Sequence, residues 1–242
     1  MSVLSLFNIA NILTLINLFS GCMAVVFIFN YQIELVPYCV LISLVADFLD
    51  GFAARLTKSA TNIGLQLDSL ADVVSFGVVP GAIIFQLLFQ KYESSDAMLS
   101  TTRMYMYSAP AFIITLFAAL RLAKFNVDTR QTDGFIGLAT PAATMFVVGL
   151  LLIFLNNSYG LAPVIFTGKV LYGTVALLAV LMIAEIPMFS FKFKNYGFAH
   201  NKVRYLFIIL SVVLLATLKF AAISLIIILY IIVSVIQKLT SK

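Results

Sequence analysis

Charged residues are scarce in this chain. Asp, Glu, Lys and Arg together make up 10% of its 242 residues, whereas hydrophobic residues make up 62%. This balance lies outside the range of ordinary soluble domains and is typical of a polytopic membrane protein. The first 11 residues contain no Lys or Arg, so they lack the basic start of a cleaved signal peptide. We therefore expect the N-terminus to remain in the mature chain.

Residues that bind soft metals are also rare. The two cysteines, Cys22 and Cys39, lie in apolar segments without Cys-x-x-Cys spacing and without a nearby histidine. We interpret them as packing residues and not as a metal or redox pair. The only histidine, His200, falls in a predicted loop and is interpreted as a surface residue.

Long apolar segments are abundant. They occupy residues 12–29, 35–56, 63–89, 109–125, 138–155, 170–188 and 203–236. Each is close to, or longer than, the roughly 20 residues that cross a bilayer as a helix. A tight turn near Lys219 would split the last segment into two helices. The sequence thus predicts an all-α polytopic membrane protein with about eight spans in one domain over residues 1–242. Short polar connectors are predicted at 90–107, 126–137, 156–168 and 189–202.

The distribution of basic residues predicts the orientation. With the N-terminus inside, 11 of the 15 Lys and Arg residues fall on the cytoplasmic side, as the positive-inside rule requires. The net charge of +5 therefore indicates topology and contact with anionic lipid, and not a nucleic-acid partner.

Four of the ten acidic residues lie within residues 46–77: Asp47, Asp50, Asp68 and Asp72. A carboxylate deep in a membrane helix costs about 2.5–3.5 kcal/mol, so this cluster requires an explanation. Spacings of three and four residues place each pair on one face of a helix. The polar turn at 57–62 predicts that the two helices run antiparallel, so that the two pairs face each other.

Two interpretations of the cluster are open. It could be a buried ion-pair network that holds two helices together, but only Arg55 and Lys58 are available nearby to balance four acids. Crowded carboxylates repel one another unless a cation enters. Hard oxygen ligands suit Mg²⁺, Mn²⁺ or Ca²⁺, so a divalent-metal site is the favoured interpretation. Small residues beside the acids allow close helix packing and leave room for a bulky anion: Ala46, Gly51, Ala53, Ala54 and Gly64.

The acidic stretch fits the pattern D-x2-D-G-x2-A-R-x8-G-x3-D-x3-D and resembles the signature of the CDP-alcohol phosphotransferase family. Every fixed position of the signature is present: Asp47, Asp50, Gly51, Ala54, Arg55, Gly64, Asp68 and Asp72. The resemblance implies a dimeric helical membrane enzyme that passes the phosphatidyl group of a CDP-linked lipid to a hydroxyl and releases CMP. It covers the first six predicted helices and implies that they form the catalytic core, over about 10–188. The divided last apolar segment is expected to form a C-terminal helical hairpin at 203–238.

The resemblance implies a role for each signature residue. Asp47, Asp50, Asp68 and Asp72 would bind Mg²⁺ or Mn²⁺, as two ions. Asp72 would also be the general base that takes the proton of the acceptor hydroxyl. Gly51, Ala54, Arg55 and Gly64 would lie against the CDP-lipid.

Residues outside the signature indicate which alcohol accepts the phosphatidyl group. Asn11, Thr14 and Asn17 recur on one face of the first helix, where they could bond neighbouring helices or contact the CDP-lipid. Their spacing resembles the first helix of the bacterial phosphatidylserine synthases that use CDP-diacylglycerol. In that pattern proline often precedes the first Asn, where this chain has Ala10. The segments at 68–80, 120–126, 137–143 and 189–197 resemble the same subfamily.

A serine acceptor needs a cation for its carboxylate. Candidates for the acceptor pocket are Arg121, Lys124 and Asn126, although Arg121 and Lys124 could equally anchor lipid headgroups. The resemblance implies transfer to L-serine at the cytoplasmic face of the inner membrane. Two alternatives remain: a sister enzyme that uses glycerol 3-phosphate or inositol phosphate, and a non-catalytic membrane cation-binding protein, as carrier or scaffold.

Overall fold

Helices form almost every element of the computed structural model, which describes residues 7–57, 61–95, 98–128, 135–189 and 197–240. Within these residues, six helical segments are long and apolar enough to cross a membrane: Ile9–Phe29, Ile33–Leu56, Asn62–Ser95, Thr101–Val127, Asn201–Leu218 and Ala221–Thr240. Two shorter apolar helices, Thr140–Leu155 and Gly168–Ile183, lie between the fourth and fifth of these segments. The predicted class of all-α polytopic membrane protein is thus confirmed.

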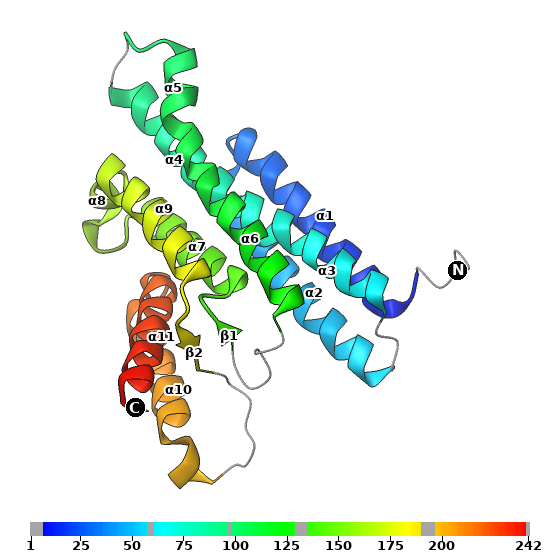
Figure 1. Ribbon diagram of the computed structural model, residues 1–242. Helices are drawn as coiled ribbons and strands as arrows, with labels where there is room; N and C mark the ends of the chain where they lie inside the picture. The colour runs from blue at the N-terminus through cyan, green and yellow to red at the C-terminus, as the bar shows by residue number, and fades with distance from the viewer. Residues whose placement is uncertain (1–6, 58–60, 96–97, 129–134, 190–196, 241–242) are drawn as a thin grey trace.

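The first half of the chain, up to Val127, forms four long helical segments (Figure 1). Its elements are α1 (Ile9–Phe29), η2 (Ile33–Leu35), α2 (Val36–Leu56), α3 (Asn62–Val73), the π-helical turn η3 (Val74–Val78) and α4 (Val79–Ser95). They are followed by α5 (Thr101–Ser108), η4 (Ala109–Phe112) and α6 (Ile113–Val127). The prediction of a polar connector at 90–107 is therefore wrong, because α4 and α5 occupy most of these residues.

The second half alternates helices with short connections. Its elements are β1 (Phe135–Ile136), α7 (Thr140–Leu155), η5 (Ser158–Gly160), α8 (Ala162–Ile165), α9 (Gly168–Ile183), β2 (Pro187–Met188), α10 (Phe198–Leu218) and α11 (Ala221–Thr240). β1 and β2 pair antiparallel over two residues each, a small exception to the helical fold. Lys219 adopts a φ of 50° between α10 and α11, at the predicted turn. His200 lies in the first turn of α10, so its predicted loop location is wrong.

Side-chain caps fix the starts of the two helices nearest the acids. The side chain of Asn8 accepts a hydrogen bond from the backbone N–H of Asn11 at the start of α1. Thr61 does the same for the N–H of Gly64 at the start of α3. Each cap satisfies a donor that the helix itself leaves unpaired. Thr61, in the polar turn at 57–62, thus defines where α3 begins.

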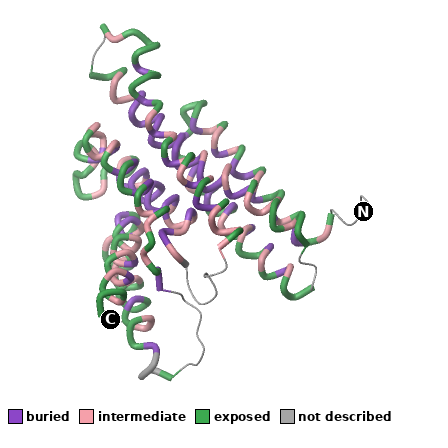
Figure 2. The backbone as a smooth tube through the Cα atoms, viewed as in Figure 1, coloured by how far each residue is buried: buried purple, intermediate pink, exposed green. Residues whose placement is uncertain are grey.

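The segment containing α4 lies at the centre of the bundle. It packs against α1, α5, α6, α7 and α9, and most of the residues of α4 are buried. Every residue from position 79 to position 89 is buried, which is why this helix is apolar on all sides. Figure 2 shows the contrast with α10, which is mostly exposed, and with α11, which buries one face and exposes the other residues in whole or in part. We expect lipid to cover their apolar side chains.

The C-terminal helix is attached to the rest of the bundle through α7. The hydroxyl of Ser224 in α11 donates to the backbone oxygen of Phe146 over 3.0 Å. Gly149 lies at the same contact, where a side-chain carbon would overlap with the hydroxyl oxygen of Ser224. The two backbones can approach this closely because position 149 carries no side chain.

Candidate functional site

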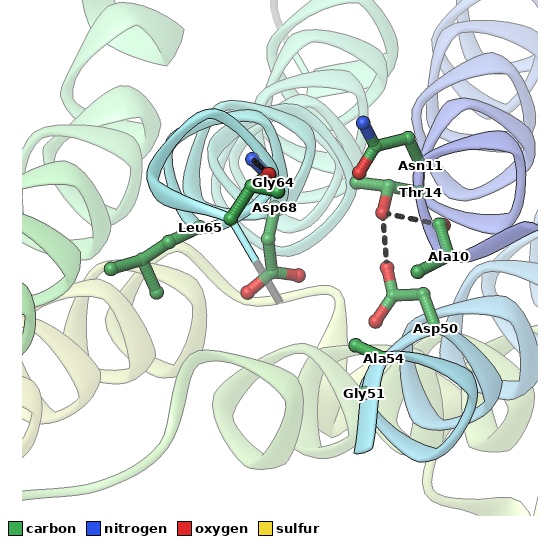
Figure 3. Close-up of a pocket in the computed structure, with 10 residues that line it drawn as sticks. Ala10, Asn11, Thr14, Asp50, Gly51, Ala54, Gly64, Leu65 and Asp68 are labelled. Carbon is green, nitrogen blue, oxygen red and sulfur yellow. Dashed lines mark hydrogen bonds between the residues drawn. The ribbon is translucent and has the colours of Figure 1, made fainter. Parts of the chain in front are cut away.

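The polar face of α1 points toward the acidic residues and not toward lipid. Asn11, Thr14 and Asn17 are all buried. The hydroxyl of Thr14 donates to Oδ2 of Asp50 in α2 over 2.6 Å and also contacts the backbone oxygen of Ala10 (Figure 3). One turn further along α1, Nδ2 of Asn17 donates to Oδ1 of Asp72 in α3 over 3.2 Å. The first helix therefore contacts one acid from each of the two predicted pairs.

Three of the four predicted acids converge. Carboxylate oxygens of Asp47, Asp50 and Asp68 all lie within 4.8 Å of one another. Figure 3 shows the carboxylates of Asp50 and Asp68 on opposite sides of the gap between α2 and α3. Among the described residues, no group bonds to the buried Oδ1 of Asp68. Three hard oxygen donors, one of them lacking a partner, fit a divalent cation of the Mg²⁺ or Mn²⁺ type.

Asp72 lies beside this group but is not part of it. It is buried, with 8% of its surface exposed, and it is held by Asn17. Asp72 also lines a cavity together with Asp47 and Asp68. Asp72 thus differs from the other three acids in its partner on α1 and in lying outside the group of three oxygens, a distinction that helix spacing alone does not make.

A first cavity of about 180 Å³ opens between α1, α2 and α3. Its walls include five residues predicted to contact the CDP-lipid: Asn11, Thr14, Gly51, Ala54 and Gly64. Asp50 and Asp68 also line this cavity. A side-chain carbon at position 64 would stand 3.0 Å from Oδ1 of Asn11, so a residue larger than glycine would narrow the first cavity. Asn17 and Arg55, predicted in the same group, do not line it.

A second cavity of about 410 Å³ lies on the other side of the acids. It is lined by residues of α2, α3, α6 and the start of α7, among them Asp47, Asp68, Asp72, Arg55, Arg121 and Asn126. Gly51, Leu65 and Asp68 line both cavities. The two spaces therefore meet at the acidic group.

The predicted acceptor residues differ in their surroundings. Arg121 is 7% exposed and lines the second cavity, and its buried Nε has no hydrogen-bond partner among the described residues. Its Nη1 lies 3.5 Å from the hydroxyl of Thr140. Lys124 lines neither cavity and pairs with Glu185 at 3.5 Å. Arg121 is thus the buried cation that faces the acids.

Asn126 contacts α3 from the end of α6. Its Nδ2 donates to the hydroxyl of Ser69 over 2.8 Å. Ser69 lines the second cavity with it. Ser69 was not among the predicted site residues, although its position one residue after Asp68 is a signal that could have identified it as part of the cavity wall.

The π-helical turn η3, which begins two residues after Asp72, has no signal in the sequence pattern. Hydroxyl groups from two other helices bond its backbone oxygens. Thr115 of α6 donates to Gly77 over 2.8 Å, and Thr144 of α7 donates to Phe76 over 3.1 Å. π-turns are rare and often occur at functional sites.

The fold and the site define a polytopic membrane protein whose carboxylates, suited to a divalent cation, lie between two cavities. The family model for CDP-alcohol phosphatidyltransferase matches residues 7–186, and the chain belongs to this family. The matched region ends before α10 and α11.

Several relatives are similar over most of their length. The chain is 36% identical to the CDP-diacylglycerol–serine O-phosphatidyltransferase of Helicobacter pylori (strain J99) over 189 residues, which is 77% of this chain and 74% of that protein. It is 32% identical to the protein of the same name from Methanocaldococcus jannaschii over 200 residues, covering 82% of this chain and 83% of the relative. The Saccharomyces cerevisiae protein of that name is 32% identical over 176 residues, covering 64% of this chain and 59% of the relative.

Proposed function

We propose that this protein is a phosphatidylserine synthase, which transfers the phosphatidyl group of CDP-diacylglycerol to the hydroxyl of L-serine and releases CMP. The names of the relatives support this reaction. The observation that carries the proposal is the junction of two cavities at one acidic group, with a buried arginine in the second cavity. A transferase needs two substrates to meet at the reacting phosphorus, and this junction gives each a separate approach.

The first cavity is the proposed site of the CDP group. Its lining combines small residues with the polar side chains of Asn11 and Thr14. Gly51 and Gly64 leave space beside the acids, so a bulky diphosphate can approach them. We assign Arg55 to the edge of the second cavity, from which it would face the same diphosphate.

The second cavity is the proposed site of serine. The serine carboxylate requires a cation, and Arg121 offers a buried guanidinium whose Nε lacks a partner among the described residues. The serine ammonium requires oxygen acceptors, which the acids on the opposite wall and the nearby Ser69 supply. We propose Arg121 and Asn126 as acceptor-binding residues, and Lys124 as a residue outside the pocket.

Asp72 is the proposed general base. It lines the serine cavity and accepts a hydrogen bond from Asn17. The serine O–H bond breaks as its proton passes to Asp72, the serine oxygen forms a bond to the phosphorus of the phosphatidyl group, and the bond from that phosphorus to the CMP oxygen breaks. CMP leaves with the electron pair of that bond.

Asp47, Asp50 and Asp68 are proposed to bind Mg²⁺ or Mn²⁺. Asp72, which lies beside them, is proposed to share in binding the metal. Two such ions, when bound, would neutralise the diphosphate and stabilise the attacking and leaving oxygens. The unpartnered Oδ1 of Asp68 and the convergence of three carboxylates support this assignment. A purely structural network is disfavoured, because none of the described cations forms an ion pair with these acids.

We further propose that the site faces the cytoplasm in the inner membrane, and that residues of about 10–188 form the catalytic core of a homodimer. The distribution of basic residues supports this orientation. Residues 203–238 form the C-terminal helical hairpin beyond that core.

A comparison of acceptors tests the proposed reaction. Purified protein is supplied with CDP-diacylglycerol and Mn²⁺, and CMP release is measured with serine, glycerol 3-phosphate or inositol phosphate. We expect release with serine. Release with glycerol 3-phosphate alone would overturn the serine assignment, and absence of release with every acceptor would overturn the enzyme class. A phosphorylated acceptor is disfavoured because Lys124, the second candidate cation, is already paired with Glu185.

A further inference from the structure

Asn17 has contacts that differ from those of the other polar residues of α1. Its side chain is fully buried and does not line the first cavity, whereas Asn11 and Thr14 do. Its Nδ2 instead donates to Oδ1 of Asp72 over 3.2 Å. Only the NH₂ end of an amide can donate to a carboxylate, so the bond also sets the orientation of the amide.

We propose that Asn17 is a positioning residue for Asp72, and not a CDP-lipid contact. This inference rests on the proposed role of Asp72 as general base. By holding Oδ1 of Asp72, Asn17 fixes the plane of the carboxylate and leaves Oδ2 to receive the proton of the acceptor hydroxyl. Positioning of this kind matters because proton transfer requires hydrogen-bond distance and alignment.

The backbone at Asn17 is itself fixed by two other helices. Its carbonyl oxygen accepts a hydrogen bond from Ser43 of α2 over 3.2 Å and another from Ser75 of η3 over 2.9 Å. Gly21, one turn further along α1, makes the second bond possible, because a side-chain carbon there would overlap with the hydroxyl oxygen of Ser75. Three helices therefore meet at the residue that holds Asp72.

The π-helical turn begins two residues after Asp72 and contributes Ser75 to this junction. A π-turn adds one residue to a helix, which rotates the helix before the turn by about 100° relative to the helix after it. Before the turn, Asp72 of α3 contacts Asn17 of α1 and lines the second cavity; after the turn, α4 is buried on all sides. The backbone oxygens in the turn are bonded by Thr115 and Thr144, so the arrangement is stabilised from outside the helix.

Substitutions of Asn17 test this role. Asn17→Asp keeps the size of the side chain but replaces the donor with a second carboxylate, and Asn17→Ala removes the side chain. For both variants we expect kcat to fall by about 100-fold, within the usual contribution of a general base, while the KM for CDP-diacylglycerol changes by less than about threefold. A contact of the CDP-lipid would instead raise that KM.

Ser20→Ala is the matched control. Ser20 is buried on the same face of α1 and bonds α2 through the backbone oxygen of Cys39 over 2.8 Å, without contacting an acid. Loss of its hydroxyl should leave kcat within about twofold of wild type. A comparable loss of kcat in Ser20→Ala would show that Asn17 acts only through helix packing and would overturn the proposal.

A double-mutant cycle separates this inference from the proposed function. If Asn17 acts through Asp72, then Asn17→Ala should change kcat by less than about twofold in an Asp72→Asn background. Independent, multiplicative effects would contradict the positioning role. Full activity of Asp72→Asn would refute the role of Asp72 as general base. If Asp72→Asn were inactive but the Asn17 variants were fully active, only the positioning role of Asn17 would be refuted. The cycle is run with whichever acceptor releases CMP from the wild-type protein.

Discussion

Thr14 and Asp50, 36 positions apart in the sequence, are joined by a hydrogen bond of 2.6 Å inside the membrane domain. The bond fixes one carboxylate of the group of three and links the first cavity to the proposed metal site. Residues that hold a metal ligand by hydrogen bonds usually contribute about 10- to 100-fold to metal affinity.

Thr14→Val should therefore raise the Mn²⁺ concentration needed for half-maximal CMP release by about tenfold, because valine keeps the shape of threonine but cannot donate to Asp50. A titration of activity with Mn²⁺ measures this effect. Ser108→Ala is a suitable control, since Ser108 is also buried but bonds only the backbone oxygen of Met104 in its own helix. An unchanged titration for Thr14→Val would show that the hydroxyl does not support metal binding.

Asp72→Asn should lower kcat by about 10²- to 10⁴-fold, the usual contribution of a general base, while much of the binding of CDP-diacylglycerol remains. Single-turnover kinetics and a lipid-binding assay measure the two effects separately. Glu93→Gln removes an exposed carboxylate at the far end of the same helical segment and should leave both unchanged. If the Asp72 variant turned over normally, another group would have to accept the proton.

Arg121→Ala should raise the KM for serine by about 10- to 100-fold, which corresponds to the loss of a hydrogen bond to a charged group. The KM for CDP-diacylglycerol should change much less, because Arg121 lines only the second cavity. Lys124→Ala provides the comparison, since Lys124 pairs with Glu185 outside both cavities and its loss should affect serine weakly. Equal effects of the two substitutions would contradict the assignment of the pocket to Arg121.

Gly149→Ala should lower the stability of the protein by about 1–3 kcal/mol, the usual cost of overpacking, because α11 approaches α7 closely at this position. The added carbon would stand 2.7 Å from the backbone nitrogen of Ser224 as well as close to its hydroxyl. Gly173→Ala is the control, since a carbon there would meet nothing within 4 Å. Thermal unfolding in detergent should show a lower midpoint for the first variant and an equal or higher midpoint for the second.

Much of the site could be predicted from helix geometry. The spacing within each acid pair and the polar turn at 57–62 predict two antiparallel helices with facing carboxylates, and the structure brings three of the four together. The turn at Lys219 is predicted by a charge in an otherwise apolar segment of about twice the length of a single span. These features depend on local spacing and hydropathy, which can be determined from a single sequence.

Other features depend on contacts between distant segments. The bond from Asn17 to Asp72 and the π-turn that follows Asp72 are two such features. Helix periodicity predicts neither of them, nor the hydroxyl groups of α6 and α7 that bond the backbone of the turn. Arg121 and Lys124 are three residues apart on one helix, yet only Arg121 reaches the cavity. The difference lies in their partners: Arg121 contacts Thr140 at the start of α7, whereas Lys124 pairs with Glu185, which follows α9.

The most direct test of the account is the fate of isotopically labelled serine. Purified protein is incubated with CDP-diacylglycerol, labelled L-serine and Mn²⁺, and then lipid and CMP are quantified together by mass spectrometry. The account predicts labelled phosphatidylserine and CMP in equal amounts, loss of both on chelation of the metal, and recovery of both when Mn²⁺ is restored. CMP formed without labelled lipid, or labelled lipid formed at the same rate without metal, would contradict it.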